Sequence, residues 1–294
     1  MPQSEIAAMD TSAENQTKSA FGSTYVHEPQ AEHTHTIILL HGRGSSGEEF
    51  AEELFEGRLS DQPKTLPERL PSCKWVFPSS PEVWNPLFQE DISAWFEAHS
   101  LTDVDARQDL QIPGIRQSVE YVLALLGQEI ETLDGRAERV FLGGISLGGA
   151  VSLWTLLCLW NAPVPRRIGG FFAVSTWLPF SKNISRVFDK GETSRPELPS
   201  DGSESDAFVE TMLSSAIVKA QSSSFLSVPV FLGHGSDDAY VDVNLGRQAR
   251  DSLLDVGFEV EWKEYLGAEQ EGHWLKCPEE MDDVASFLSR NMIY

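Results

Sequence analysis

The chain has 294 residues, 41% of them hydrophobic and 23% charged, a composition that fits one large globular domain or two small ones. Its formal net charge of −23 would repel nucleic acid and anionic membrane surfaces, so we expect neither as a partner. We also expect no stable membrane insertion, because the apolar runs are too short or too interrupted to span a bilayer.

The cysteine content favours a reducing compartment. Cys73, Cys158 and Cys277 are odd in number and lack the spacing of metal ligands. The first residues show neither the basic nor the apolar region of a secretory signal peptide. We therefore expect a cytoplasmic protein.

The predicted elements alternate between strands and helices. Residues 1–33 are polar without an apolar period, and we expect them to form a disordered tail. A strand buried on both faces is predicted at residues 36–40, and further strands are predicted at residues 74–77, 139–143, 170–175, 228–232 and 259–265. Helices are predicted at residues 48–54, 115–133, 150–159, 246–256 and 280–292. This alternation predicts one α/β domain over residues 34–294, with a mostly parallel central sheet and helices on both faces.

One segment, residues 181–225, breaks this alternation. Its first part, up to about residue 205, is rich in Ser, Pro, Gly and Asp, and residues 207–220 form a short amphipathic stretch. We interpret the segment as an insertion that is part flexible and part helical. It is either a flap near the site or a solvated loop without function.

The most informative motif is Gly144-Ile145-Ser146-Leu147-Gly148, which lies between a predicted strand and a predicted helix. The nucleophile elbow of an α/β-hydrolase has this form. Its turn strains the serine backbone, and glycines on either side have no Cβ that would clash. The Ser146 hydroxyl would then lie at a helix N-terminus, near backbone N–H groups that can stabilise an oxyanion. The alternative is an ordinary turn, since the pattern also occurs in Gly/Ser-rich loops.

Candidate partners for the serine follow in the order Ser, Asp, His that this fold requires. Asp237 and Asp238 both follow the strand at 228–232, where an acid can orient a histidine, although either could be a loop acid or a helix N-cap. His273 lies in the loop between the last predicted strand and the last helix. A single histidine in a loop is weak support for a catalytic role. The occurrence of Ser, Asp and His in this order, each in a loop after a strand, is much rarer than the occurrence of any one of them.

The segment His41-Gly42-Arg43-Gly44-Ser45-Ser46-Gly47 follows the first buried strand and contains the dinucleotide fingerprint G-x-G-x-x-G. That fingerprint needs an acid at the end of the second strand, and none occurs before Glu82, so we favour an oxyanion loop. We expect His41 to be a structural hydrogen-bonding residue. His33 and His35 could share a strand face but have no third ligand, so we expect no metal site.

These motifs resemble those of the acyl-protein thioesterase/phospholipase-carboxylesterase family of serine hydrolases, most closely its fungal members. The matching segments are Leu40-His41-Gly42-Arg43-Gly44, Ala94-Trp95-Phe96, Gly144-Ile145-Ser146-Leu147-Gly148-Gly149-Ala150, Ser175-Thr176-Trp177-Leu178-Pro179, His234-Gly235-x-x-Asp238-x-x-Val241 and Gly272-His273. The resemblance implies a single small α/β-hydrolase domain without a large cap.

The resemblance also implies roles for the reacting side chains. It places the nucleophile on Ser146, the acid on Asp238 rather than Asp237, and the base on His273. No metal and no organic cofactor would be required.

Further roles follow from the same resemblance. The backbone N–H groups of Arg43 and Leu147 would be the oxyanion donors. Trp95, Trp177 and Leu178 would contact the substrate.

The chain departs from the family pattern at three places. Leu147 stands where the family usually has Gln, Ser236 stands where it usually has Asp, and the insertion after Phe180 is longer than in typical members. These departures concern the substrate more than the chemistry.

The expected function is hydrolysis of carboxylic esters or thioesters through an acyl-enzyme, with S-acylated proteins among the substrates. An esterase or lactonase for a small metabolite is an alternative that Leu147 and the insertion favour. A catalytically silent hydrolase fold used for binding is a further alternative, and the intact Ser, Asp and His set argues against it.

Overall fold

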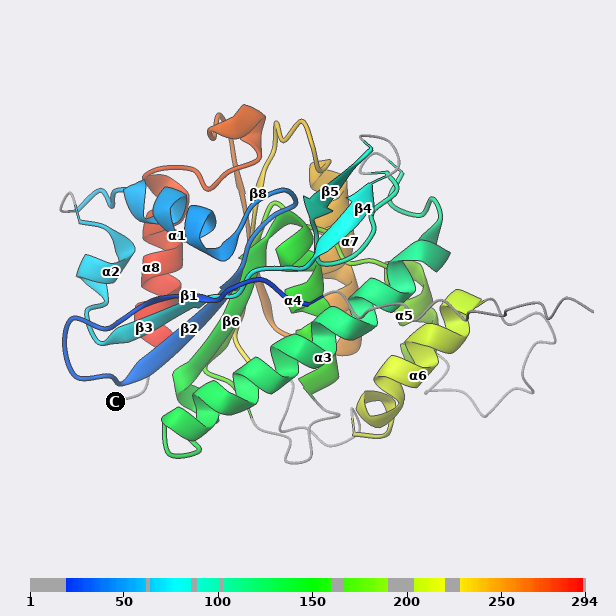
Figure 1. The fold of residues 1–294 in the computed structure, drawn as a ribbon, viewed down its shortest axis with the longest axis horizontal. Helices are drawn as coiled ribbons and strands as arrows, with labels where there is room; N and C mark the ends of the chain where they lie inside the picture. Colours follow the sequence, from blue (N-terminus) through cyan, green and yellow to red (C-terminus); the bar gives the residue numbers. More distant parts are fainter. Residues whose placement is uncertain are drawn as a thin grey trace, which may run out of the picture.

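The computed structural model describes residues 20–61, 64–85, 89–100, 103–159, 167–189, 204–219 and 228–292. Within them, seven strands form one sheet in the order β1-β3-β2-β6-β7-β8-β9 (Figure 1). Their bounds are β1 Tyr25–His27, β2 His35–Leu40, β3 Cys73–Phe77, β6 Val140–Ile145, β7 Gly170–Val174, β8 Val230–Gly235 and β9 Val260–Tyr265. Only the β1–β3 pair is antiparallel. The predicted mostly parallel sheet is confirmed.

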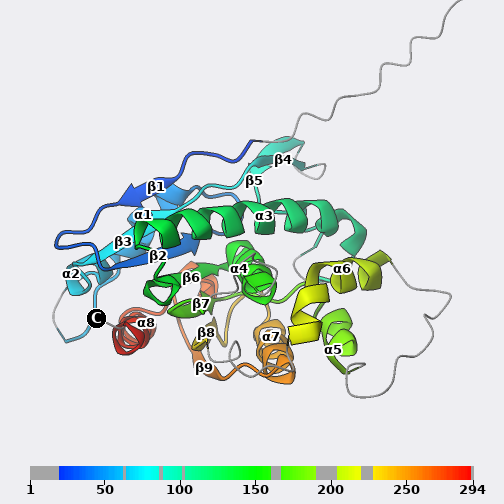
Figure 2. The same ribbon diagram turned by 90° about the horizontal axis from the view of Figure 1, so that it is seen from below.

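Helices cover both faces of this sheet, as the sequence predicts. Their bounds are α1 Gly47–Glu56, α2 Leu66–Arg69, α3 Gln108–Thr132, α4 Ser146–Cys158, α5 Ser181–Asp189, α6 Glu204–Lys219, α7 Val243–Val256 and α8 Glu279–Asn291. Figure 2 shows α3, α4 and α7 on one side of the sheet and α8 on the other. No helix within the described residues is both long enough and apolar enough to cross a bilayer.

The two faces of the sheet bury separate hydrophobic clusters. Alternate residues of β2 contribute to each: Ile38 and Leu40 pack with α3 and α4, whereas Ile37 and Leu39 pack with α1 and α8. Every residue of β2 is buried, which explains why its sequence is a continuous apolar run rather than an alternating one. A strand buried on both faces is held firmly, so the loops at its carboxyl end have a rigid support.

The N-terminal boundary differs from the prediction. The segment expected to be disordered, residues 1–33, contains strand β1, and residues 1–19 lie outside the described residues. β1 pairs with β3 at the edge of the sheet, where Val26 faces Val76. This strand is short and only half-buried, so main-chain hydrogen bonds hold it without an apolar period that the sequence could reveal.

A small hairpin and a short helix are also absent from the sequence prediction. The hairpin consists of β4 Glu82–Asn85 and β5 Glu90–Ser93, which pair with each other outside the main sheet. The short helix α2 has a capping box, in which Thr65 and Glu68 bond to each other's backbone N–H groups.

The segment at 181–225 is described only at α5 and α6. The prediction of a flexible part falls on residues 190–203 and 220–227, which lie outside the described residues. The first helix occupies part of the Ser-rich stretch for which the sequence showed no helical period. Aromatic packing holds this region on the body of the domain, because Trp154 of α4 lies 5.1 Å from the ring of Phe208 on α6.

Candidate active site

The predicted site residues come together where the parallel strands end. β2, β8 and β9 each lead into a loop at one edge of the sheet, and β6 leads there directly into α4, because parallel strands end at the same edge. A cavity of about 540 Å³ opens there. It is lined by Gly42, Arg43, Ser45, Phe50, Glu53, Ile145, Ser146, Tyr240, Gln270, Glu271, His273 and Trp274.

Ser146 begins helix α4 in a strained backbone conformation. Its φ is +53°, in the left-handed region that a residue with a side chain rarely adopts. The turn closes only because its neighbours are glycines: a Cβ on Gly148 would lie 2.3 Å from the His41 carbonyl oxygen, and one on Gly144 would lie 2.7 Å from the Leu40 carbonyl oxygen. The Thr176 hydroxyl donates to the Ser146 carbonyl at 2.7 Å and holds the turn from the β7 side. This is the geometry that the sequence motif predicts.

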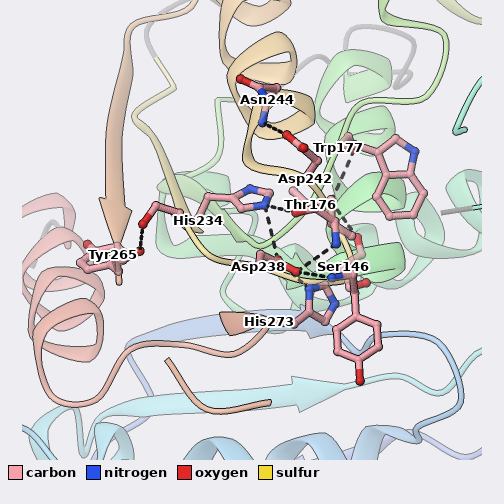
Figure 3. Close-up of polar contacts among 12 residues, drawn as sticks. Ser146, Thr176, Trp177, His234, Asp238, Asp242, Asn244, Tyr265 and His273 are labelled. Atoms are coloured by element: carbon pink, nitrogen blue, oxygen red, sulfur yellow. Dashed lines mark hydrogen bonds and ion pairs between the residues drawn. The ribbon is translucent and has the colours of Figure 1, made fainter. Parts of the chain in front are cut away.

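His273 and Asp238 form a short hydrogen bond. The distance from His273 Nδ1 to Asp238 Oδ2 is 2.7 Å (Figure 3). The carboxylate is an acceptor, so Nδ1 carries the proton and Nε2 is left as the basic nitrogen. The Asp238 side chain is fully buried and that of His273 is 15% exposed, so the imidazole is accessible from the cavity while the carboxylate is not.

The Asp238 carboxylate is held by more than this histidine. Its Oδ1 accepts backbone N–H bonds from Tyr240 and Val241, both at 2.9 Å. Buried His234 lies on its other side, with Nε2 3.4 Å from Oδ2 (Figure 3). Burial alone would raise the pKa of Asp238, but hydrogen bonds from His234 and His273 hold this pKa well below its usual range. Asp238 is therefore ionised at neutral pH.

His234 is a contributor to the site that the sequence reasoning missed. Its Nε2 donates to the Val241 carbonyl at 2.8 Å, so it ties together the two ends of the loop that carries Asp238. The signal was present in the sequence, since a histidine at the end of a buried strand needs polar partners. Spacing alone could not reveal which partners it would find.

The structure distinguishes the two candidate acids. Asp237 is exposed and accepts the Gly267 backbone N–H at 3.0 Å, so its carboxylate stabilises a neighbouring loop. Asp238 is the one beside His273.

Ser146 and His273 line the same cavity without a direct bond between their side chains. Among the described residues, the Ser146 hydroxyl takes part in no hydrogen bond of 3.5 Å or less. Such contacts are often long in a site without substrate and shorten when substrate binds. The arrangement is compatible with a nucleophile and its base.

The loop after β2 packs directly on the candidate nucleophile. A Cβ on Gly42 would lie 3.5 Å from Ser146 Cβ. The loop is held by His41, whose Nδ1 donates to the Gly42 carbonyl at 2.6 Å and whose Nε2 accepts the Ser80 N–H at 3.0 Å. Burial lowers the pKa of His41 to about 4, so it is neutral, which suits both bonds. The expectation that His41 is a structural residue is confirmed.

The two predicted oxyanion donors adjoin Ser146. Leu147 is the second residue of α4, where a helix supplies no acceptor for the N–H. Arg43 follows Gly42 in the loop that contacts Ser146. The Leu147 side chain is fully buried in the core, so the residue that departs from the family pattern does not face the cavity.

The three residues expected to contact substrate do not line this cavity. Trp95, Trp177 and Leu178 are at most 3% exposed and belong to the hydrophobic core. Trp95 supports the loop instead, because its indole N–H donates to the His41 carbonyl at 2.9 Å.

The cavity wall comes from residues that the sequence reasoning missed. Phe50, Tyr240 and Trp274 supply its aromatic surface, and the Tyr240 ring lies 5.4 Å from that of His273. These residues come from three separate segments, so no local motif could have assembled them. None of the lining residues belongs to α5 or α6, which leaves the proposed flap without support in the described part of the chain.

Metal ligands do not cluster in the described residues. No group of three or more His, Cys, Asp or Glu side chains there is placed to hold an ion. The His33 ring bonds to Thr36 and the His35 ring to Thr34, so these two imidazoles have separate partners.

Comparison with known proteins agrees with this fold. The family model for phospholipase/carboxylesterase matches residues 22–227 and 207–292. Acyl-protein thioesterase 1 of Gibberella zeae is 27% identical over 267 residues, which cover 89% of this chain and 92% of that protein. Carboxylesterase SOBER1 of Arabidopsis thaliana is 26% identical over 259 residues, covering 87% of this chain and 90% of that protein.

A solved structure gives the same result. The crystal structure of Zea mays acyl-protein thioesterase 2 superposes with a TM-score of 0.67 at 27% identity, covering 92% of this chain and 99% of that one. The chain therefore belongs to the phospholipase/carboxylesterase family and is an α/β-hydrolase that acts on ester or thioester bonds.

Proposed function

We propose that this protein cleaves carboxylic esters or thioesters through an acyl-enzyme formed on Ser146. The observation that carries the proposal is the His273–Asp238 bond at the cavity that Ser146 lines. A strained serine at a helix N-terminus, a histidine fixed by a buried carboxylate, and nearby backbone donors together support acyl transfer.

In the proposed mechanism, His273 Nε2 takes the proton of Ser146 as the hydroxyl attacks the carbonyl carbon. The N–H groups of Arg43 and Leu147 stabilise the negative oxygen that forms. His273 then gives its proton to the leaving alcohol or thiol. In the second half, His273 activates a water molecule that attacks the acyl-enzyme and regenerates Ser146. Asp238 stabilises the imidazolium in both halves.

We further propose S-acylated proteins as the substrate class. This assignment rests on the relatives in Gibberella zeae and Zea mays, which are named acyl-protein thioesterases. A cytoplasmic location is part of the proposal, because Cys73, Cys158 and Cys277 are all unpaired thiols.

The nucleophile is tested with a fluorophosphonate probe. Wild-type protein is expected to be labelled and to hydrolyse a chromogenic ester, and Ser146→Ala is expected to lose labelling and to fall in kcat by roughly five orders of magnitude. Ser45→Ala, which removes another hydroxyl of the same cavity, should keep its labelling. Undiminished labelling of Ser146→Ala would refute the assignment.

A second candidate function is hydrolysis of small, polar esters. It is favoured by the charged side chains of Arg43, Glu53 and Glu271 in the cavity wall, which a long acyl chain would not need. A series of thioesters of increasing acyl length separates the two. A rise of kcat/KM with chain length supports the S-acylated substrate class, and a short-chain optimum supports the small ester.

A further inference from the structure

The Arg43 side chain is the cationic part of the cavity wall that the proposed mechanism leaves without a role. Its backbone N–H is a proposed oxyanion donor, and the residue as a whole lines the cavity that also holds Ser146 and His273. The residue is half-buried, so its charge is partly withdrawn from water.

Most of the other arginines in the described residues have carboxylate partners. Seven of them form ion pairs, namely Arg58, Arg107, Arg136, Arg186, Arg247, Arg250 and Arg290. In contrast, no hydrogen bond or ion pair within the described part of the chain engages the Arg43 guanidinium. Four further arginines of the described residues, Arg69, Arg116, Arg139 and Arg167, also lack an ion pair there, but Arg43 differs from them in lining the cavity that holds Ser146.

The surroundings of the Arg43 guanidinium do not offset the free-energy cost of its partial burial. Burial lowers the pKa of Arg43, and the charge of Glu97, which lies beyond ion-pair distance, acts in the opposite direction. A guanidinium remains protonated throughout the physiological range, so the cost of its desolvation has to be offset by an anionic partner. A carboxylate fits this need well, because it accepts two parallel hydrogen bonds from one guanidinium.

The acidic residues of the same cavity do not supply that partner. Glu53 and Glu271 are both exposed, so water screens their charges, and neither forms an ion pair with Arg43. They would also disfavour a doubly charged phosphate more than a singly charged carboxylate. In the cavity wall, the half-buried Arg43 therefore carries a positive charge that the exposed Glu53 and Glu271 do not neutralise.

The position of Arg43 limits where the anion can be on the substrate. The side chain starts from the same residue whose N–H would hold the oxyanion, so its reach is centred on the reacting carbonyl. An anion that it binds must lie within a few bonds of the scissile ester or thioester.

We infer that Arg43 binds a carboxylate of the substrate, and that the preferred esters or thioesters carry a carboxylate close to the scissile bond, on either the acyl or the leaving-group side. This inference rests on the proposed serine chemistry at Ser146 and narrows its substrate class. It applies equally to an S-acylated peptide with an acidic residue beside the cysteine and to a small acidic ester.

Matched pairs of thioesters test the inference. On the leaving-group side, the S-butyryl thioester of 3-mercaptopropionate is compared with the same thioester of its methyl ester. On the acyl side, S-glutaryl-mercaptoethanol is compared with its methyl-glutaryl counterpart. For each pair the quantity measured is the ratio of kcat/KM for the acid to kcat/KM for the methyl ester, which cancels any change common to both substrates.

For wild-type protein, this ratio is expected to exceed one in at least one of the two pairs. The pair with the higher ratio shows whether Arg43 binds a carboxylate on the acyl side or on the leaving-group side of the substrate. Arg43→Gln should lower that ratio by about tenfold or more, the effect of losing a charge-assisted hydrogen-bonded pair. Arg43→Lys keeps the positive charge but lacks the two parallel N–H donors of a guanidinium, so it should retain part of the preference for the acid. Arg58→Gln, at a neighbouring cavity, should leave the ratio within about twofold of wild type.

Failure of this inference is distinguishable from failure of the proposed chemistry. A ratio of one or less in both pairs, or a preference that Arg43→Gln leaves intact, overturns the role of Arg43 while Ser146-dependent turnover continues. A second measurement does not require turnover: glutarate should bind Ser146→Ala more tightly than it binds Ser146→Ala/Arg43→Gln, by about tenfold. Equal affinities would contradict the inference.

Discussion

At Asp238, one buried carboxylate oxygen faces two histidine rings, and these have different tasks. His273 is partly exposed and faces the cavity, whereas His234 is buried and bonds to the Val241 carbonyl. Because hydrogen bonds hold the pKa of Asp238 well below its usual range, the carboxylate keeps its charge at neutral pH. Asp238 therefore fixes both the tautomer and the orientation of His273.

Substituting Asp238 tests that role at the scale of one residue. Asp238→Asn keeps the shape of the side chain but removes the charge that fixes the tautomer, so kcat should fall by about three to four orders of magnitude. Asp237→Asn, next in the chain and exposed, should keep kcat within about twofold. Steady-state hydrolysis of one chromogenic ester measures both, and a similar loss in the two variants would contradict the assignment of the acid.

Residues in local motifs were predictable from the sequence, and residues joined only by the fold were not. Ser146 and His273 could be proposed because each stands in a recognisable strand–loop context in the required order. Spacing left Asp237 and Asp238 equivalent, since only the direction of each side chain separates them. The aromatic wall, including Tyr240, comes from segments far apart in the chain.

At the scale of elements, the loop after β2 is held in place by residues behind it. Trp95 donates to the His41 carbonyl, the His41 ring accepts from Ser80, and the Ser93 hydroxyl donates to the Ser45 carbonyl at 2.6 Å. This network joins the loop to Ser80, which precedes the hairpin, and to Ser93, which ends it, and so supports the loop that carries the proposed oxyanion donor Arg43. Positioning of this kind acts on the transition state, because the oxyanion exists only there.

Removing the indole N–H of Trp95 tests whether this residue supports the loop after β2 or contacts the substrate. Trp95→Phe should lower kcat by about two- to tenfold, the effect of one hydrogen bond, with KM little changed. If Trp95 contacted the substrate as the sequence reasoning expected, KM would rise instead. Trp75→Phe is the matched control, because the Trp75 indole N–H is buried without a hydrogen-bond partner, so its loss should leave kcat unaltered.

The inner strands of the central sheet were predictable from the sequence because they are buried on both faces. β2, β6 and β8 are buried on both faces, so each appears in the sequence as a continuous apolar run. The edge strand β1 and the hairpin strand β5 are half-exposed or exposed and at most four residues long, which leaves no such pattern.

At the scale of the whole molecule, a buried carboxyl group joins the last helix to the sheet. Glu280 of α8 is 1% exposed, and a Cβ on Gly233 of β8 would lie 2.0 Å from its Oε1, so the absence of a side chain at Gly233 makes room for it. Its Oε2 accepts the Lys276 backbone N–H at 2.9 Å, in the segment that follows His273. Burial raises the pKa of Glu280 to about 8, and nearby Asp283 adds to this, while the bond from Lys276 opposes it.

The raised pKa makes a specific prediction for stability. A carboxyl group whose pKa is higher in the folded state stabilises the fold fully below its unfolded pKa, and that contribution is lost as the pH rises toward about 8. Relative to wild type, Glu280→Gln should therefore gain stability between about pH 4.5 and pH 8 and stay level above that, with a total change of a few kcal/mol. Denaturant unfolding across this range measures it. Glu279→Gln, at an exposed neighbour, should show no such trend, and a flat difference for Glu280→Gln would contradict the account.

The most direct measurement is the site of the acyl-enzyme. Wild-type protein is mixed with a chromogenic ester, quenched in acid during turnover and digested, and the peptides are analysed by mass spectrometry. The acyl group should be found on Ser146 in the wild type and on no residue of Ser146→Ala, and in Asp238→Asn it should form more slowly. An acyl group on any other side chain, or turnover by Ser146→Ala at the wild-type rate, would contradict the proposal that Ser146 is the nucleophile.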